Sequence, residues 1–144
     1  MIHWIRGKVL AVDPGEKRIG LAVSDDSGSI ANPLVVIKHV SRQTDAERII
    51  QLAEENQVQC ILVGQSVNED NQPTPQGRSA ARLAEVIRFH AQIPVILWDE
   101  SGSTQAARSA RLAMGVSRRK RHGHMDDLAA TYLLQDYLNG EESP

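Results

Sequence analysis

The order of apolar runs along the chain is the feature that most restricts its fold. Three strand-like runs come first, over Lys8–Val12, Ile19–Ser24 and Pro33–Val40. They are separated by Asp13–Gly15 and Asp25–Gly28, whose Asp, Pro, Ser and Gly residues are typical of turns. Connections this short join antiparallel strands. The first part of the chain therefore predicts an antiparallel meander.

The middle of the chain alternates helical and strand-like patterns. Thr44–Glu47 matches the Ser/Thr-x-x-Glu capping box, and the apolar residues from Ala46 to Ala53 follow at the spacing of one helix face. Val58–Val63 is continuously apolar, as expected of a strand buried on both faces. A polar loop over Ser66–Gln76 then leads into a second helical pattern that begins at about Gly77.

The last third continues this alternation. The apolar run Pro94–Trp98 predicts a strand, and a helix from Ser103 to Met114 is expected to end at Gly115. The final helix is predicted over Asp126–Leu138, after a basic loop. The order βββαβαβαα predicts an α/β fold with a five-stranded mixed sheet. Its three antiparallel strands come first and parallel strands follow, with helices on the faces.

Length and composition fit one ordinary folded domain. The chain has 144 residues, of which 41% are hydrophobic and 24% charged, and a domain usually contains about 100–200 residues. No linker or internal repeat divides it, so residues 1–144 are expected to form a single domain. No apolar run reaches the ~18 residues of a membrane-spanning helix, and no cleavage site follows the first strand. We therefore expect a cytoplasmic protein with no membrane contact.

Charge is unevenly distributed along the chain. The formal net charge is only −2, yet Ser101–Met125 contains six basic residues and no acidic one. Four of the six form one block, Arg118, Arg119, Lys120 and Arg121. A basic block in an otherwise acidic chain is typical of contact with a polyanion. We predict a loop at this block that contacts the phosphate backbone of a nucleic acid, with a merely solvated loop as the alternative.

Three acidic residues are expected at one edge of the predicted sheet. Asp13 follows the first strand, Glu100 follows the last and Asp126 opens the final helix. Functional sites of open α/β sheets lie at the carboxyl ends of the central strands. Carboxylates gathered there repel one another unless a cation neutralises them, and Mg²⁺ prefers oxygen ligands. The pattern predicts that the three residues bind Mg²⁺ or Mn²⁺ and catalyse phosphodiester hydrolysis.

Neighbouring acidic residues leave two of these assignments open. Adjacent side chains of a strand point to opposite faces, so only one of Asp99 and Glu100 can face the site. Asp127 can replace Asp126 if the final helix is rotated. Each carboxylate also has a purely structural explanation, as a turn residue, a helix cap or a solvated strand end.

Four segments of the chain form a recognisable series. The longest is Asp13–Asp25, which reads DPGEKRIGLAVSD. It is followed by Ile61–Gly64, by Asp99–Glu100 with Thr104, and by Met125–Ala130. In this order the segments resemble the motifs of the YqgF family, which comprises pre-16S rRNA nucleases and Holliday-junction-resolvase-like proteins. The resemblance covers nearly the whole chain, and the first motif is its most specific part.

The resemblance implies a ribonuclease H-like fold in which the three carboxylates named above hold the metal. It also implies that Lys17, Arg18 and Thr104 lie near nucleic acid. The activity it implies is an endonuclease for structured nucleic acid that processes the 5′ end of pre-16S rRNA in ribosome biogenesis. The alternative within the family is a resolvase that cleaves branched DNA in recombination or repair.

The chain departs from the family pattern in two places. Ser101–Thr104 stands where the family usually has Arg-Leu-Thr-Thr, so a basic residue expected near the substrate is missing. Gln65 and Ser66 replace the usual Leu-Pro after Gly64. These changes weaken the inference about the substrate more than the one about the carboxylates.

Two other functions fit parts of the sequence. Asp13–Gly15 followed by Gly20–Val23 is similar to the first phosphate-binding hairpin of actin-like ATPases, but those enzymes enclose nucleotide between two such domains and this chain has one. A non-catalytic RNA-binding adaptor would use the basic block without the carboxylates. Aromatic residues make up only 3% of the chain, which leaves little to stack on unpaired bases. Contacts with phosphates and duplex shape are therefore favoured.

Overall fold

Five strands and three helices make up the part of the chain that the computed structural model describes, residues 7–100 and 118–142. In chain order they are β1 (Val9–Pro14), β2 (Arg18–Ser24), β3 (Ala31–Lys38), α1 (Arg42–Glu55), β4 (Cys60–Ser66), α2 (Pro75–His90), β5 (Val95–Glu100) and α4 (Arg118–Glu142). The helix expected over Ser103–Met114 lies outside the described residues, as does Thr104. The described elements follow the predicted order.

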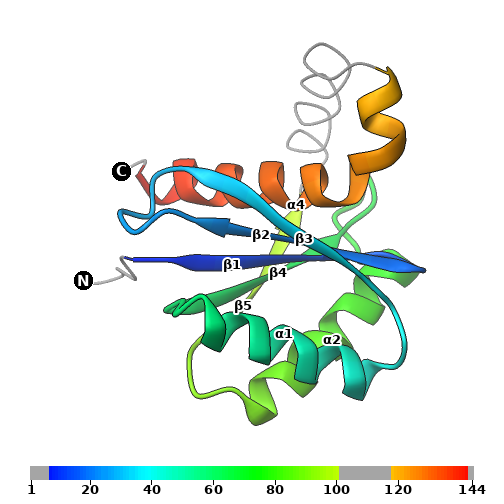
Figure 1. Cartoon of the computed structure of the whole chain (residues 1–144). Helices are drawn as coiled ribbons and strands as arrows, with labels where there is room; N and C mark the ends of the chain where they lie inside the picture. The colour runs from blue at the N-terminus through cyan, green and yellow to red at the C-terminus, as the bar shows by residue number, and fades with distance from the viewer. Residues whose placement is uncertain (1–6, 101–117, 143–144) are drawn as a thin grey trace.

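The strands form one mixed sheet in the order β3-β2-β1-β4-β5. β1 pairs antiparallel with β2, and β2 with β3, whereas β4 runs parallel to both β1 and β5. The predicted meander followed by parallel strands is therefore confirmed. Figure 1 shows α1 and α2 against one face of the sheet and α4 against the other, so the fold has three layers.

The two central strands, β1 and β4, are buried on both faces. Leu10 and Val12 of β1 belong to the core beneath α1 and α2, while Val9 and Ala11 belong to the core beneath α4. β4 alternates in the same way, and its Cys60 is a buried cysteine whose Sγ donates a weak hydrogen bond to the carbonyl oxygen of Ile61. Burying a large apolar side chain contributes about 1.5–3 kcal/mol. These strands therefore form a rigid base for the polar residues at their carboxyl ends.

Helix α1 begins at Arg42, earlier than the capping box predicted at Thr44–Glu47. Its cap is Ser41, whose Oγ accepts a hydrogen bond of 3.1 Å from the backbone N–H of Thr44. Ser41 and Thr44 are both suitable caps by residue type, and their separation by three residues explains the error. The sequence predicted the helix correctly and misplaced its start by one turn.

Helix α4 is much longer than predicted. It begins at Arg118, so the block Arg118–Arg121 lies in the first turn of a helix and not in a loop, and Asp126 is internal to the helix. Arg and Lys are good helix formers, and an internal Asp costs less than about 1 kcal/mol. The acidic pair therefore does not force the helix to start there. In the described residues, neither α4 nor another helix combines the length and apolar character needed to cross a membrane.

The turn between β2 and β3 anchors α4 to the sheet. Gln135 of α4 accepts a hydrogen bond from the backbone N–H of Ala31 and donates one to the carbonyl oxygen of Ser29, both at 3.0 Å. The turn is itself ordered by Asp25, which accepts hydrogen bonds from the N–H groups of Ile30 and Ser29. These bonds, with one from Ser27, hold the pKa of the Asp25 carboxyl below its ordinary value. The helix is thus fixed at a defined position along the sheet.

Gly77 allows α2 to approach β4 closely. Thr74 caps the helix, because its Oγ1 accepts a hydrogen bond of 3.0 Å from the N–H of Gly77. A Cβ atom built on Gly77 would collide with the carbonyl oxygen of Ser66 at the end of β4. A glycine is therefore required in the first turn of this helix.

We expect Gly77→Ala to destabilise the protein by about 1–3 kcal/mol, the usual cost of overpacking, although alanine is the better helix former. Gly140→Ala is the matched control, because a Cβ at Gly140 would lie 3.9 Å from Cη2 of Trp98, an ordinary contact. The control should gain up to about 1 kcal/mol from helix propensity. Urea unfolding measures both changes. If both substitutions changed the free energy of unfolding in the same direction, the close approach of α2 to β4 would be contradicted.

Candidate functional site

Asp13 lies inside β1 at its carboxyl end, not in the turn after it. It pairs with Gly20 of β2, and it follows Val12, which pairs with Val63 of β4. Because side chains alternate along a strand, Asp13 belongs to the same face as Val9 and Ala11, the face covered by α4. The Asp13 side chain is half-buried at this edge.

Glycines flank Asp13 on both neighbouring strands. Gly20 is its partner on β2, and Gly64 is the next residue after Val63 on β4. Neither glycine has a side chain to stand beside the carboxylate. Glycine inside a strand often marks a place where a ligand or another backbone comes close. The sheet beside Asp13 is therefore bare backbone on both neighbouring strands.

Glu100 is the last residue of β5, where it pairs with Ser66 of β4. Trp98, two residues earlier on β5, packs in the core beneath α4. Strand alternation therefore assigns position 100 to the α4 face and position 99 to the opposite face. Of the two acidic positions on β5, it is position 100 that shares a face with Asp13.

Asp126 lies on α4, at the level of Asp13 along the sheet. Figure 1 shows the carboxyl end of α4 beside the amino end of β1, so the two run in opposite directions. Gln135 contacts Ala31, which pairs with Ser24 of β2. Ser24 lies beside the amino end of β1, because the preceding residue, Val23, pairs with Leu10. Position 126 lies nine residues before Gln135, about 13 Å back along the helix. Asp13 lies about 13 Å along β1 from Val9, so the two positions lie at about the same level along the sheet.

Helix periodicity does not choose between Asp126 and Asp127. The buried stripe of α4 consists of Ala130, Leu133, Leu134, Tyr137 and Leu138. At about 100° per residue, positions 126 and 127 lie on either side of the centre of this stripe, each about 50° away from it. Both positions therefore lie next to the helix face that covers the sheet.

The basic residues predicted to contact nucleic acid lie on two elements. Lys17 and Arg18 are exposed and lie at the turn from β1 to β2, directly after the Asp13 edge. The turn requires Gly15, since its N–H donates to the carbonyl oxygen of Arg18 at 2.8 Å and a Cβ there would lie 2.6 Å from the same oxygen. The block Arg118–Arg121 begins α4, and Figure 1 shows this first part of the helix bending away from the sheet.

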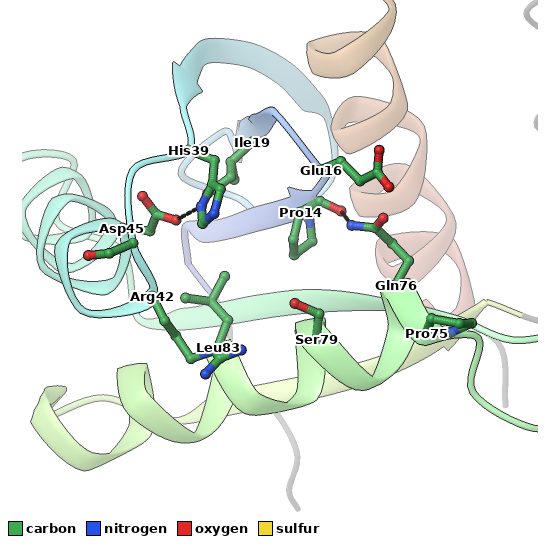
Figure 2. Close-up of a pocket in the computed structure, with 12 residues that line it drawn as sticks. Pro14, Glu16, Ile19, His39, Arg42, Asp45, Pro75, Gln76, Ser79 and Leu83 are labelled. Carbon is green, nitrogen blue, oxygen red and sulfur yellow. Dashed lines mark hydrogen bonds and ion pairs between the residues drawn. The ribbon is translucent and has the colours of Figure 1, made fainter.

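A hollow that the sequence did not predict opens on the other side of this turn (Figure 2). Its volume is about 460 Å³, and its walls include Pro14, His39, Arg42 and Ser79. Gln76 of α2 donates a hydrogen bond of 2.9 Å from Nε2 to the carbonyl oxygen of Pro14. This bond ties the start of α2 to the residue next to Asp13.

A buried carboxylate forms one wall of the hollow. Asp45 is only 2% exposed; its Oδ1 accepts a hydrogen bond of 3.0 Å from the N–H of Val40, and its Oδ2 contacts Nδ1 of His39. It was missed as a functional candidate because Thr44–Glu47 was interpreted only as a helix cap. The interaction orients the His39 ring at the mouth of the hollow.

The fold is shared with solved resolvase structures. RuvC of T. thermophilus in complex with a Holliday junction substrate superposes with a TM-score of 0.58 at 19% identity, over 96% of this chain and 98% of that one. The fowlpox virus resolvase in complex with Holliday junction DNA gives a TM-score of 0.57 at 11% identity, over 94% and 99%. The protein therefore has the ribonuclease H-like fold of these resolvases, as the sequence resemblance implied.

The family is shown by sequence. A family model described as "RuvX: Holliday junction resolvase" matches residues 7–140, and the chain belongs to this family, which confirms the resemblance to YqgF. A protein of Thermoanaerobacter pseudethanolicus is 39% identical over 94% of this chain and 99% of its own length. One of Clostridioides difficile is 38% identical over 92% and 94%. Both carry the name "Putative pre-16S rRNA nuclease".

We expect Asp45→Ala to lower the free energy of unfolding by about 1–3 kcal/mol, because the N–H of Val40 loses its partner in a buried place. Asp26→Ala is the matched control, since the Asp26 side chain is 94% exposed and lies 3.7 Å from Nζ of Lys8. An exposed pair of this kind contributes less than about 1 kcal/mol. Urea unfolding at neutral pH compares the two. Equal effects would contradict a structural role for Asp45 in this wall.

Proposed function

We propose that this protein is a metal-dependent endonuclease that hydrolyses phosphodiester bonds in structured nucleic acid, and that it processes the 5′ end of pre-16S rRNA. The observation that carries the proposal is that positions 13 and 100 lie at one edge and on one face of the sheet, the face that α4, the helix containing position 126, covers. The names of relatives 39% and 38% identical to the chain support the substrate.

The residues at this edge fit a hard divalent cation. Asp13, Glu100 and Asp126 would supply only carboxylate oxygens, the ligands that Mg²⁺ and Mn²⁺ prefer. Gly20 and Gly64 place no side chain of β2 or β4 between Asp13 and such an ion. When bound, the ion would supply a Lewis acid that activates water and neutralises charge on the phosphate.

The protein's own part in the reaction is to fix the carboxylates and hold the substrate. Asp13 is carried by a strand that is paired on both edges, so its backbone has little freedom to move. Lys17, Arg18 and the block Arg118–Arg121 would contact phosphates on either side of the cleaved bond. Such contacts position the nucleic acid without reading its sequence, which suits recognition by shape.

We expect Asp13→Asn to reduce cleavage more than about a hundredfold, because changing groups that merely orient a metal ligand already costs about 10–100-fold. The assay compares a pre-16S rRNA 5′ leader with a synthetic four-way DNA junction, with Mn²⁺ and with EDTA. Asp26→Asn, an exposed carboxylate at the other end of the sheet, should retain full activity.

Each outcome of this assay separates two functions. Equal cleavage by the wild type and Asp13→Asn would contradict the carboxylate site. Preferential cleavage of the junction would make the protein a resolvase and remove the rRNA assignment. Binding of the rRNA leader without cleavage by any variant would favour the RNA-binding adaptor.

The basic block should determine how steeply binding depends on salt. Each phosphate contact contributes about 0.7–0.9 to the slope of log K against log salt concentration. We expect the double change Arg118→Gln and Arg119→Gln to reduce this slope by about 1.5. Fluorescence anisotropy between about 50 and 200 mM KCl measures it. Lys8→Gln, at the opposite end of the sheet, is the control. An equal reduction of the slope in this variant and in the double variant would contradict a specific role for the block.

A further inference from the structure

The outer face of α2 combines exposed arginine with an exposed aromatic ring. Its inner face is apolar and buried, and consists of Ala80, Leu83, Ala84 and Ile87. Phe89 lies off this face and is 84% exposed, and it is the only phenylalanine in the chain. Arg82, two turns earlier, is also exposed. The packing of α2 does not use these two side chains.

Two hollows lie one after the other along this face. The first, of about 460 Å³, starts at Pro14, beside Asp13, and reaches Arg42 of α1 (Figure 2). The second, of about 480 Å³, includes Arg42, Arg82 and Phe89 among its walls. Arg42 is common to both. The hollows therefore lead from Pro14 to Phe89 along the face of the sheet that α1 and α2 cover, whereas Asp13 belongs to the opposite face, which α4 covers.

The length of this path suits several nucleotides. Gln76, bonded to Pro14, and Phe89 are 13 residues apart on α2, a distance of about 20 Å along the helix. Nucleotides stacked as in a helix advance about 3.4 Å each. About six nucleotides would span the path.

Two arginines supply the groups along the path that can bind an anion. Arg42 and Arg82 are exposed, and neither forms an ion pair with another described residue. Three acidic groups also line the hollows. Glu16 and Asp45 line the first, where Asp45 is bonded to His39 and to the N–H of Val40, and Glu85 lines the second. The two guanidinium groups remain available for phosphates, with which arginine forms strong hydrogen bonds.

We propose that Arg42, Arg82 and Phe89, which we call the α2 track, bind a single-stranded segment of the substrate that passes from the cleaved bond round the carboxyl end of β1 to the opposite face of the sheet. Arg42 and Arg82 contact its phosphates, and the Phe89 ring stacks on an unpaired base. An exposed aromatic ring beside cations is the usual platform for single strands, whereas a duplex keeps its base faces inside. The α2 track rests on the proposed nuclease function for its substrate. It differs from the expectation that few aromatic residues are available for base stacking, since one exposed ring is enough for one such contact.

Binding to two RNA duplexes tests the α2 track. One duplex is blunt, and the other carries single-stranded arms on both strands; Asp13→Asn is the common background, so that the RNA stays intact. Stacking of a base on an aromatic side chain is lost on alanine substitution at a cost of about 1–3 kcal/mol. We therefore expect Phe89→Ala to weaken binding of the armed duplex about tenfold and to leave the blunt duplex unchanged. Phe89→Trp should retain tight binding.

Ile30→Ala is the matched control for loss of an exposed apolar side chain. Ile30 is 57% exposed and lies in the turn between β2 and β3, at the other end of the sheet. We expect this variant to bind both duplexes as tightly as the background does.

An abasic site in the arm isolates the stacking contact. A single base is removed at each arm position in turn, and one position should lose the same tenfold affinity as Phe89→Ala. Combining that abasic site with Phe89→Ala should cost no more than either change alone, because the two remove the same interaction. Additive losses at every position would overturn the stacking contact.

The salt slope tests the arginines separately. Arg42→Gln and Arg82→Gln should each reduce the slope for the armed duplex by about 0.7, the value for one phosphate contact with a single strand. Lys8→Gln should leave it unchanged. Unchanged slopes for both arginine variants would overturn their part in the track.

Further outcomes overturn the proposal as a whole. If Phe89→Ala lost the same affinity for the blunt duplex as for the armed duplex, or lost none for either, a surface for single strands would be excluded. A change of oligomeric state in Phe89→Ala, measured by light scattering, would make the face a contact between copies of the chain. Cleavage that depends on Asp13, together with unchanged armed binding by Phe89→Ala, refutes the track and leaves the nuclease standing. If no RNA is cleaved but Phe89→Ala still weakens binding of the armed duplex alone, the nuclease function is refuted and the α2 track is kept.

Discussion

The burial of β1 on both faces is the constraint on which the rest of the structure depends. β1 is paired on both edges and lies between the helical layers, so its apolar residues have only one arrangement that removes them all from water. Asp13 is the first polar residue of β1, and it follows directly after the four buried residues Val9–Val12. Gly20 and Gly64 stand beside it. The contacts that stabilise the sheet thus also position the carboxylate.

Much of this could be predicted from the sequence, because the governing signals are local. The apolar runs and the turn residues between them predicted the meander and the parallel strands, and the polar residue at the end of each run predicted the edge that carries Asp13 and Glu100. Helix ends were less predictable. Ser41 and Thr44 can each cap a helix, and Arg118–Arg121 has no residue type that excludes a helix. Where these helices begin depends on how they pack against the rest of the protein, and a local sequence pattern carries no information about that packing.

The hollows beside α2 could not be predicted for a different reason. They arise where α1 crosses α2, so that Arg42 comes close to Arg82 although 40 residues separate them in the chain. Phe89 did leave a sequence signal, since it falls outside the buried spacing of Ala80, Leu83 and Ala84. Composition alone counted it as one of few aromatic residues, whereas its exposure makes its ring accessible for the contact proposed above.

The bonds of Gln135 to the turn between β2 and β3 have a consequence for the opposite end of α4. The helix carries Asp126 about 13 Å from this anchor, and its packing surface of alanine, leucine and tyrosine would tolerate sliding along the sheet. A slip of one turn would shift Asp126 by about 5.4 Å, further than the diameter of a metal site. The hydrogen bonds of Gln135 therefore fix where position 126 lies along the sheet, although they are made at the end of the sheet opposite to Asp13.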